Sequence, residues 1–175
     1  MRAQSSFLAE FKQAFNKEVG QKVHWFGGQV AENCAAFVSP YPCRRAVGVR
    51  TTERFELGDA SVSYLGWKVI IEFDSKGLSP SNILKYWPYL RGELNIKPAQ
   101  PIIFCHFSDW CSWATSRDLW EWTLSRMQAD QELRVEIKGK QFDHGGSDQS
   151  LRASSISSAI KWIASVARAD RGGAV

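Results

Sequence analysis

The sequence of 175 residues contains no apolar run that approaches the roughly 20 residues needed to cross a bilayer. Charged side chains interrupt the segment Phe7-Leu8-Ala9-Glu10-Phe11-Lys12 near the amino terminus, which excludes the apolar core of a signal peptide there. The cysteines show neither CxxC spacing nor the density of a small secreted protein, so reduced thiols are expected. We therefore expect a soluble, cytoplasmic protein with no membrane partner.

The sequence also lacks the closely paired ligand spacing that is typical of zinc sites. The residues that would have to form such a site are scattered along the chain: His24, Cys34, Cys43, Cys105, His106 and Cys111. His106 lies within an apolar segment and is expected to be a hydrogen-bonded core histidine. The pairs Gly27-Gly28 and Gly145-Gly146 lack the strand, glycine-rich loop and helix of a phosphate-binding loop. Zinc proteins and P-loop proteins are therefore disfavoured.

Tryptophan, by contrast, is frequent, with eight residues. Large aromatic side chains contribute much of the buried area of a protein, so most of them are expected in the core. The net charge of +4 permits a polyanionic partner but does not require one. The length is that of one domain, which we expect over residues 1–170, with a flexible tail over 171–175.

The spacing of apolar residues predicts an α/β protein in the order helix, three strands, helix, strand, helix, strand, helix. The first helix should be capped by Ser5 or Ser6 and end near Gly20. The second should have Ser79 as its cap, with Pro80 following, and should end near Gly92 or earlier at Pro88. The other two helices should bury the residues Leu119, Trp120, Thr123, Leu124 and Met127 in 113–129, and Ile156, Ala159, Ile160, Ile163 and Ala167 near the carboxyl end.

The strands are predicted from alternation and from continuous apolar runs. A meander of three strands is expected over 47–53, 55–65 and 68–74, a central buried strand over 101–108, and a further strand over 133–140. Residues 30–38 are compatible with either a helix or a strand.

The segment from Asp59 to Asp74 is the most informative. Glu72 and Asp74 share one face of a strand because side chains alternate. Leu65-Gly66 suits a two-residue turn, and the register set by that turn pairs residues whose numbers add to 131. Asp59 then faces Glu72, and the reverse face of the hairpin is uniformly apolar, which disfavours any slip in register.

Neighbouring carboxylates repel each other and raise each other's pKa unless a cation lies between them. Mg²⁺ prefers oxygen ligands and keeps several of its waters, so Asp59, Glu72 and Asp74 are candidate metal ligands. A metal-bound water could attack a phosphodiester while the metal offsets charge on the phosphate. The alternative is that these acids are the ordinary exposed polar face of an amphipathic hairpin.

The string Glu56-Leu57-Gly58-Asp59, twelve further residues and then Glu72-Phe73-Asp74, followed by a helix and a buried strand, resembles the PD-(D/E)XK nuclease superfamily. The resemblance covers roughly residues 5–108. It implies a restriction-endonuclease-like α-βββ-α-β core, with a mixed central sheet flanked by helices and a C-terminal helical extension. It also implies that Asp59 and Glu72 bind Mg²⁺, or alternatively Mn²⁺, and that the substrate is nucleic acid, with DNA favoured over RNA.

Asp74 departs from the family pattern, because it stands where the family usually has lysine. Some members carry that lysine on the following helix, which makes Lys85 the candidate and Lys76, in a loop, its rival. A helical wheel at about 100° per residue places Lys85 about 160° from Trp87, the centre of the apolar stripe, which favours the alternative of a solvated lysine. Glu10 on the first helix is a further candidate acid, although a surface glutamate is the simpler interpretation.

Two other segments have open interpretations. Lys161, Trp162, Arg168 and Arg171 could form a basic edge with an exposed aromatic ring for a phosphate backbone, or an ordinary solvated helix face. The tryptophans of 109–113 could pack on the sheet edge or line a partner surface.

The sequence thus predicts a Mg²⁺-dependent endonuclease with Asp59, Glu72, Asp74 and Lys85 as its catalytic residues. One alternative is a non-catalytic member of the same fold that binds nucleic acid or a protein. Another is an assembly protein whose tryptophans form an oligomer interface, such as that of a homodimer.

Overall fold

Two sheets and five helices make up the computed structural model, which describes residues 3–20, 22–27, 34–38, 52–74, 79–94, 97–109 and 114–169. The helices are α1 (Ala3–Glu18), α2 (Ser79–Leu84), α3 (Trp87–Leu90), α4 (Ala114–Gln128) and α5 (Gln149–Ala169). The strands are β1 (Phe26–Gly27), β2 (Cys34–Val38), β3 (Thr52–Glu56), β4 (Ala60–Tyr64), β5 (Trp67–Asp74), β6 (Ile102–Ser108) and β7 (Ile137–Asp143). The predicted α/β class is confirmed.

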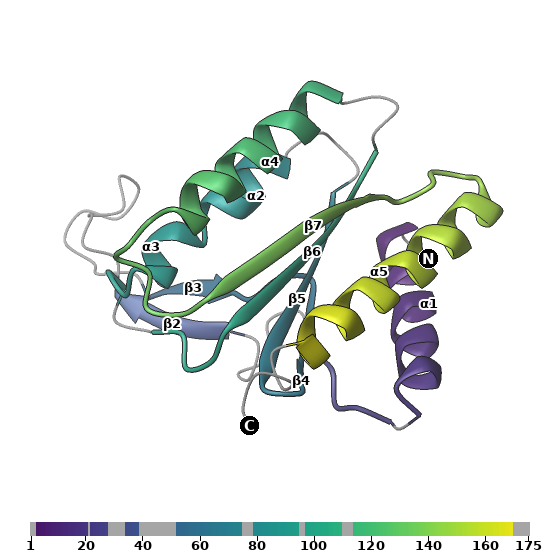
Figure 1. The fold of residues 1–175 in the computed structure, drawn as a ribbon, viewed down its shortest axis with the longest axis horizontal. Helices are drawn as coiled ribbons and strands as arrows, with labels where there is room; N and C mark the ends of the chain where they lie inside the picture. The colour runs from purple at the N-terminus through teal and green to yellow at the C-terminus, as the bar shows by residue number, and fades with distance from the viewer. Residues whose placement is uncertain are drawn as a thin grey trace.

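The larger sheet is mixed and has the strand order β1-β4-β5-β6-β7. The neighbours β4 and β5 are antiparallel, whereas β5, β6 and β7 run parallel to one another. Helices cover both faces of this sheet, with α1 and α5 on one side and α2 and α4 on the other (Figure 1). Every residue of β6 is buried, which confirms the predicted central strand.

The β4–β5 hairpin has the predicted register. Ala60 pairs with Ile71 and Val62 pairs with Val69, so the paired numbers add to 131. The turn residues Leu65 and Gly66 both have positive φ, at 51° and 89°. Such a turn matches the right-handed twist of the two strands and fixes how they align.

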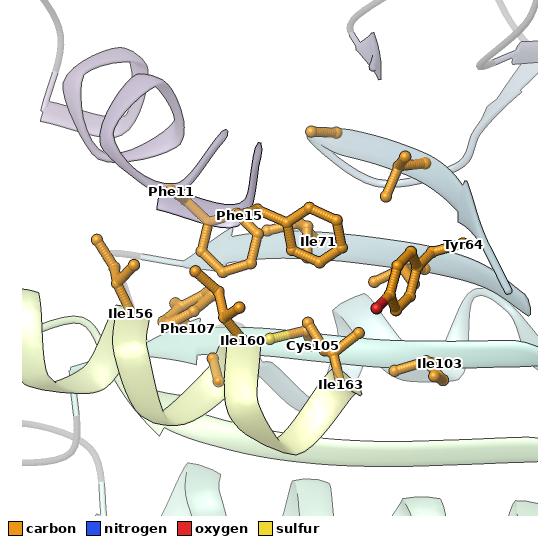
Figure 2. Close-up of a cluster of buried hydrophobic side chains, with 14 of the residues drawn as sticks. Phe11, Phe15, Tyr64, Ile71, Ile103, Cys105, Phe107, Ile156, Ile160 and Ile163 are labelled. Atoms are coloured by element: carbon orange, nitrogen blue, oxygen red, sulfur yellow. The ribbon is translucent and has the colours of Figure 1, made fainter. Parts of the chain in front are cut away.

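The side chains form two separate cores, one on each face of the sheet. Figure 2 shows the first core, in which Phe11 and Phe15 of α1 meet Ile160 of α5 over Ile71 and Phe107 of the strands. The second core lies under α2, α3 and α4 and includes Ile70, Ile83, Tyr86, Leu90, Phe104, Trp120, Leu124 and Met127. The predicted apolar stripe of the last helix is confirmed, since its members are all buried.

The predicted meander of three strands is wrong. Strand β3 pairs with β2 in a separate two-stranded sheet, and β4 pairs on its other side with the short strand β1. Gly58 has a φ of 77°, and this left-handed residue interrupts the extended chain between β3 and β4. Residues 47–50 and 30–33 lie outside the described ranges, while Cys34–Val38 is a strand.

Several helix predictions need correction at their ends. Helix α1 already includes Ala3, so Ser5 and Ser6 lie within it rather than at its cap. Leu119 is 49% exposed, because the buried stripe of α4 runs through Trp120, Thr123, Leu124 and Met127 instead. The helix predicted after Ser79 is divided into α2 and α3, with Pro88 in the first turn of α3, so its early end is confirmed.

The last strand, predicted over 133–140, begins four residues too early and ends three residues too early. Strand β7 spans Ile137–Asp143, and Leu133 and Val135 pack against the second core from the preceding loop. Residues 171–175 and 110–113 lie outside the described ranges. Among the helices that the structure describes, none is long and apolar enough to cross a membrane.

Candidate active site

Asp59 lies directly before β4, at the end of the hairpin where β5 finishes. Its backbone N–H donates to the carbonyl of Ile71 across 2.9 Å, and its Oδ2 accepts from the backbone N–H of Phe73 across 2.8 Å. A side-chain hydrogen bond from Gln4 at the start of α1 also reaches this carboxylate. Three hydrogen bonds, two with β5 and one with α1, therefore fix the position of Asp59.

Gly58 makes this approach of the chain possible. A Cβ atom there would lie 2.7 Å from both Ile70 Cγ2 and the carbonyl oxygen of Ile71. The positive φ of Gly58 is also strained for any residue with a Cβ. A glycine at position 58 is therefore needed for the Asp59 carboxylate to lie against β5.

Glu72 lies on β5 and is only 7% exposed. Lys85 Nζ is 2.5 Å from its Oε1, and the hydroxyl of Tyr86 donates to the same oxygen across 2.6 Å. Lys85 and Tyr86 occupy the break between α2 and α3. The break therefore supplies both groups that bind Glu72.

Electrostatics couple these side chains. Burial raises the pKa of Glu72, Lys85 opposes that effect, and Asp59 adds to it. Burial also raises the pKa of Asp59, against the lowering effects of the Phe73 N–H and of Lys85. The pKa of Tyr86 is raised well above its usual value, first by burial and then by Glu72. We refer to Asp59, Glu72, Lys85 and Tyr86 together as the acid–lysine site.

The structure thus brings together three of the four residues predicted as catalytic. The fourth, Asp74, is buried at the end of β5, two residues beyond Glu72 and in the same register row as Ser108 and Asp143. Lys76 lies outside the described ranges. Glu10 accepts from Ser6 and forms an ion pair with Arg152, so it joins α1 to α5.

Within the described part of the chain, no three His, Cys, Asp or Glu side chains form a group that could hold a metal ion. A divalent cation in the acid–lysine site would therefore be held by Asp59 and Glu72, with water and substrate oxygens completing its shell. Mg²⁺ is commonly bound in this way, through one or two carboxylates. Each acid already has one oxygen bound, Oδ2 of Asp59 and Oε1 of Glu72, and such an ion would bind through their other oxygens.

The sequence did not identify Tyr86 as a site residue or His106 as a neighbour of the site. Tyr86 could not be recognised from the sequence because an aromatic residue near Ile83 and Trp87 is typical of a core position. His106 was expected to be hydrogen-bonded, but its buried Nε2 has no hydrogen-bond partner among the described residues. The signal for His106 in the sequence was a histidine within the apolar run 101–108, and only the structure shows that it is in register with Glu72.

The remaining candidate sites are less organised. Cys105 is a free thiol whose pKa burial raises, and it faces the first core. Lys161 and Arg168 are exposed on α5, but Trp162 is half-buried and packs 6.0 Å from Phe142 between ring centroids. Trp162 is therefore not the exposed aromatic ring that the basic-edge alternative requires.

No protein-family model, curated protein or solved structure matches this chain. The chemistry open to the acid–lysine site follows from its side chains: two acids suited to a divalent cation, a lysine suited to an anion, and a tyrosine that orients one of the acids.

Proposed function

We propose that this protein is a Mg²⁺-dependent endonuclease of the PD-(D/E)XK type, with a restriction-endonuclease-like fold, that hydrolyses phosphodiester bonds of nucleic acid, DNA in preference to RNA. The observation that carries the proposal is the 2.5 Å contact of Lys85 Nζ with Glu72 Oε1, beside Asp59. A lysine from the break between the two helices after the hairpin is thereby adjacent to the second acid, where the variant motif needs a lysine.

The order of elements supports the same proposal. Helix α1 is followed by β1, by β2 and β3 of the smaller sheet, and by the antiparallel hairpin β4–β5. Then come α2, α3 and β6, which runs parallel to β5. This sequence of elements is compatible with the α-βββ-α-β core, with β1 as the third strand of that unit at the sheet edge. The elements from α4 to α5 correspond to the C-terminal extension.

Each side chain has a role in this proposal. Asp59 and Glu72 hold the ion, which when bound supplies an acidified water and offsets phosphate charge. Lys85 neutralises Glu72 in the absence of substrate, and its ammonium group is the cation available to a scissile phosphate. Tyr86 keeps Glu72 Oε1 fixed. Asp74, two residues beyond Glu72 on β5, assists as an acid that orients water.

A plasmid-nicking assay with Mg²⁺ or Mn²⁺ tests the proposal. Lys85→Gln should lower the nicking rate by about 10²–10³-fold, the usual effect of removing one group that stabilises transition-state charge. Lys17→Gln is the matched control, because Lys17 is an exposed lysine in the last turn of α1, at the end of that helix away from Gln4. Wild-type protein that nicks no plasmid with either metal, or Lys85→Gln protein that nicks at the wild-type rate, would overturn the proposal.

A second candidate is a non-catalytic member of the same fold that binds nucleic acid or a protein. It is favoured by Asp74 in the motif position of lysine and by the binding of both Lys85 and Tyr86 to Glu72 Oε1. Retardation of DNA on a gel by protein that is inactive with both metals would favour this candidate over the nuclease.

A further inference from the structure

Polar side chains continue from the acid–lysine site across the middle of the sheet. The parallel registers align Glu72 of β5 with His106 of β6, and His106 with Gln141 of β7. All three are at most 7% exposed. His106 faces Trp120 of α4 with 5.6 Å between ring centroids, so this buried polar row lies beneath α4. A polar row in this position is unexpected, because the surrounding core is apolar.

The row contains several polar atoms that the protein leaves unsatisfied. Among the described residues, His106 Nε2, Trp120 Nε1, and both Nε2 and Oε1 of Gln141 are buried without a hydrogen-bond partner. Buried polar groups in folded proteins are almost always hydrogen-bonded, either to protein or to ordered water. Three such atoms in the row and a fourth on Trp120 of α4 therefore indicate bound water.

A small cavity lies where that water is needed. It has a volume of about 10 Å³ and is lined by Glu72, Asn82, Tyr86, His106 and Trp120 together with apolar side chains. This is about the space that one water molecule requires, and an internal water usually makes two to four hydrogen bonds. The carboxylate, the amide, the imidazole and the indole N–H provide that number of polar groups.

We propose that this cavity is the site of one ordered water molecule that joins His106 Nε2 to the carboxylate of Glu72, which makes His106 a positioning residue for Glu72. Lys85 and Tyr86 both bind Oε1, so a bond from the water fixes the rotation of the carboxylate about its last torsion. The effect of His106 on metal binding by Glu72 rests on the proposed function, whereas the water site itself does not.

The charge state of His106 suits this role. Burial, aided by the positive charge of Lys85, lowers the pKa of His106 to about 3. At neutral pH the imidazole is therefore uncharged, and it can hydrogen-bond a water without placing a second cation beside Glu72.

A crystal structure of the wild-type protein tests the water site directly, with or without metal. Water density within hydrogen-bonding distance of both His106 Nε2 and the Glu72 carboxylate is expected, and it should be absent in His106→Leu. A dry cavity, or a protein group bonded to His106 Nε2 in place of water, would overturn the inference.

Titration with Mn²⁺ alone tests the positioning role. Loss of a group that orients a metal ligand usually weakens metal binding about 10–100-fold. We expect this weakening in His106→Leu and near-wild-type affinity in His106→Gln, whose amide can bind the same water. Ile103→Ala, which truncates a buried residue on the opposite face of β6, controls for general destabilisation. Equal Mn²⁺ affinity in His106→Leu and wild type would overturn the positioning role.

The two proposals fail separately. If wild-type protein binds no Mn²⁺, the metal-dependent function fails, and the crystallographic water alone then decides the inference about His106. If wild type binds Mn²⁺ but the cavity is dry, the function stands and the role of His106 is wrong.

Discussion

The backbone N–H of Phe73 donates a hydrogen bond to Oδ2 of Asp59, so a side-chain carboxylate takes the place of a strand carbonyl at the end of the β4–β5 ladder. The last paired residues of β4 and β5 are Ala60 and Ile71, and Asp59 extends this pairing by one position. The acid is therefore held by the hairpin itself. Its position depends on the residue before it, Gly58.

Gly58→Ala should destabilise the protein and displace Asp59. The new Cβ would lie 2.7 Å from Ile70 Cγ2 and from a backbone oxygen, in addition to the strain of the positive φ. We expect a loss of unfolding free energy of about 3 kcal/mol or more in urea denaturation, as for other overpacked positions with backbone strain. Gly20→Ala is the matched control, because Gly20 has a φ of 69° with nothing within 4 Å of a built Cβ. It should lose only about 1–2 kcal/mol, the cost of the left-handed conformation. Equal losses in the two variants would show that the close approach at Gly58 is unimportant.

The hairpin could be predicted because its information is local. A two-residue turn and the alternation of side chains determine the register, and Asp59 and Glu72 follow from it. The helical wheel favoured a solvated Lys85 because it assumes one continuous helix. The chain breaks between α2 and α3, and Lys85 turns toward Glu72 at that break.

Features that depend on distant segments could not be predicted. Strand β3 pairs with β2 rather than with β4. The alternation of side chains does not distinguish between these two possible partners. The row of Glu72, His106 and Gln141 requires the registers of three parallel strands that are separated by helices. No turn links those strands, so no local rule aligns their polar residues.

Glu72→Gln should increase stability at pH 7 although it removes a candidate metal ligand. The raised pKa means that the native state binds more protons than the unfolded state between the ordinary pKa of 4.5 and the raised one. Stability therefore falls as pH rises through that window, by about 1.4 kcal/mol for each pKa unit of the raise. The neutral amide avoids this loss and can still accept from Lys85 and Tyr86. Urea unfolding at pH 7 measures the gain, and the exposed Glu121→Gln should change stability by less than about 0.5 kcal/mol. A clear loss of stability in Glu72→Gln would mean that the Lys85 ion pair outweighs the burial of the acid.

His106 should make the protein sensitive to acid. Its pKa is about 3 in the folded chain against 6.5 for an ordinary histidine, so the unfolded state binds more protons between these values. Stability is therefore fully present above pH 6.5 and is lost as pH falls, with a slope of up to about 1.4 kcal/mol per pH unit. His106→Gln lacks this titration, and its unfolding free energy should depend less on pH between 6.5 and 4. The acids of the site titrate in both proteins, so the difference between the two curves isolates His106. Parallel curves would contradict a neutral, buried imidazole.

Tyr86→Phe tests whether the hydroxyl supports Glu72 rather than only filling the core. The variant keeps the ring, which packs 4.9 Å from Phe104 between centroids, but removes the 2.6 Å hydrogen bond to Glu72 Oε1. A hydrogen bond to a charged group contributes about 1.5–3 kcal/mol, and we expect a loss of that size in urea unfolding. In the Glu72→Gln background the same change should cost about 1 kcal/mol less, because the acceptor is then neutral. Tyr64→Phe removes a hydroxyl from the opposite core and should show no such dependence on Glu72→Gln. If the cost of Tyr86→Phe is the same in both backgrounds, the hydroxyl does not act through the charge of Glu72, and the tyrosine belongs to the core rather than to the acid–lysine site.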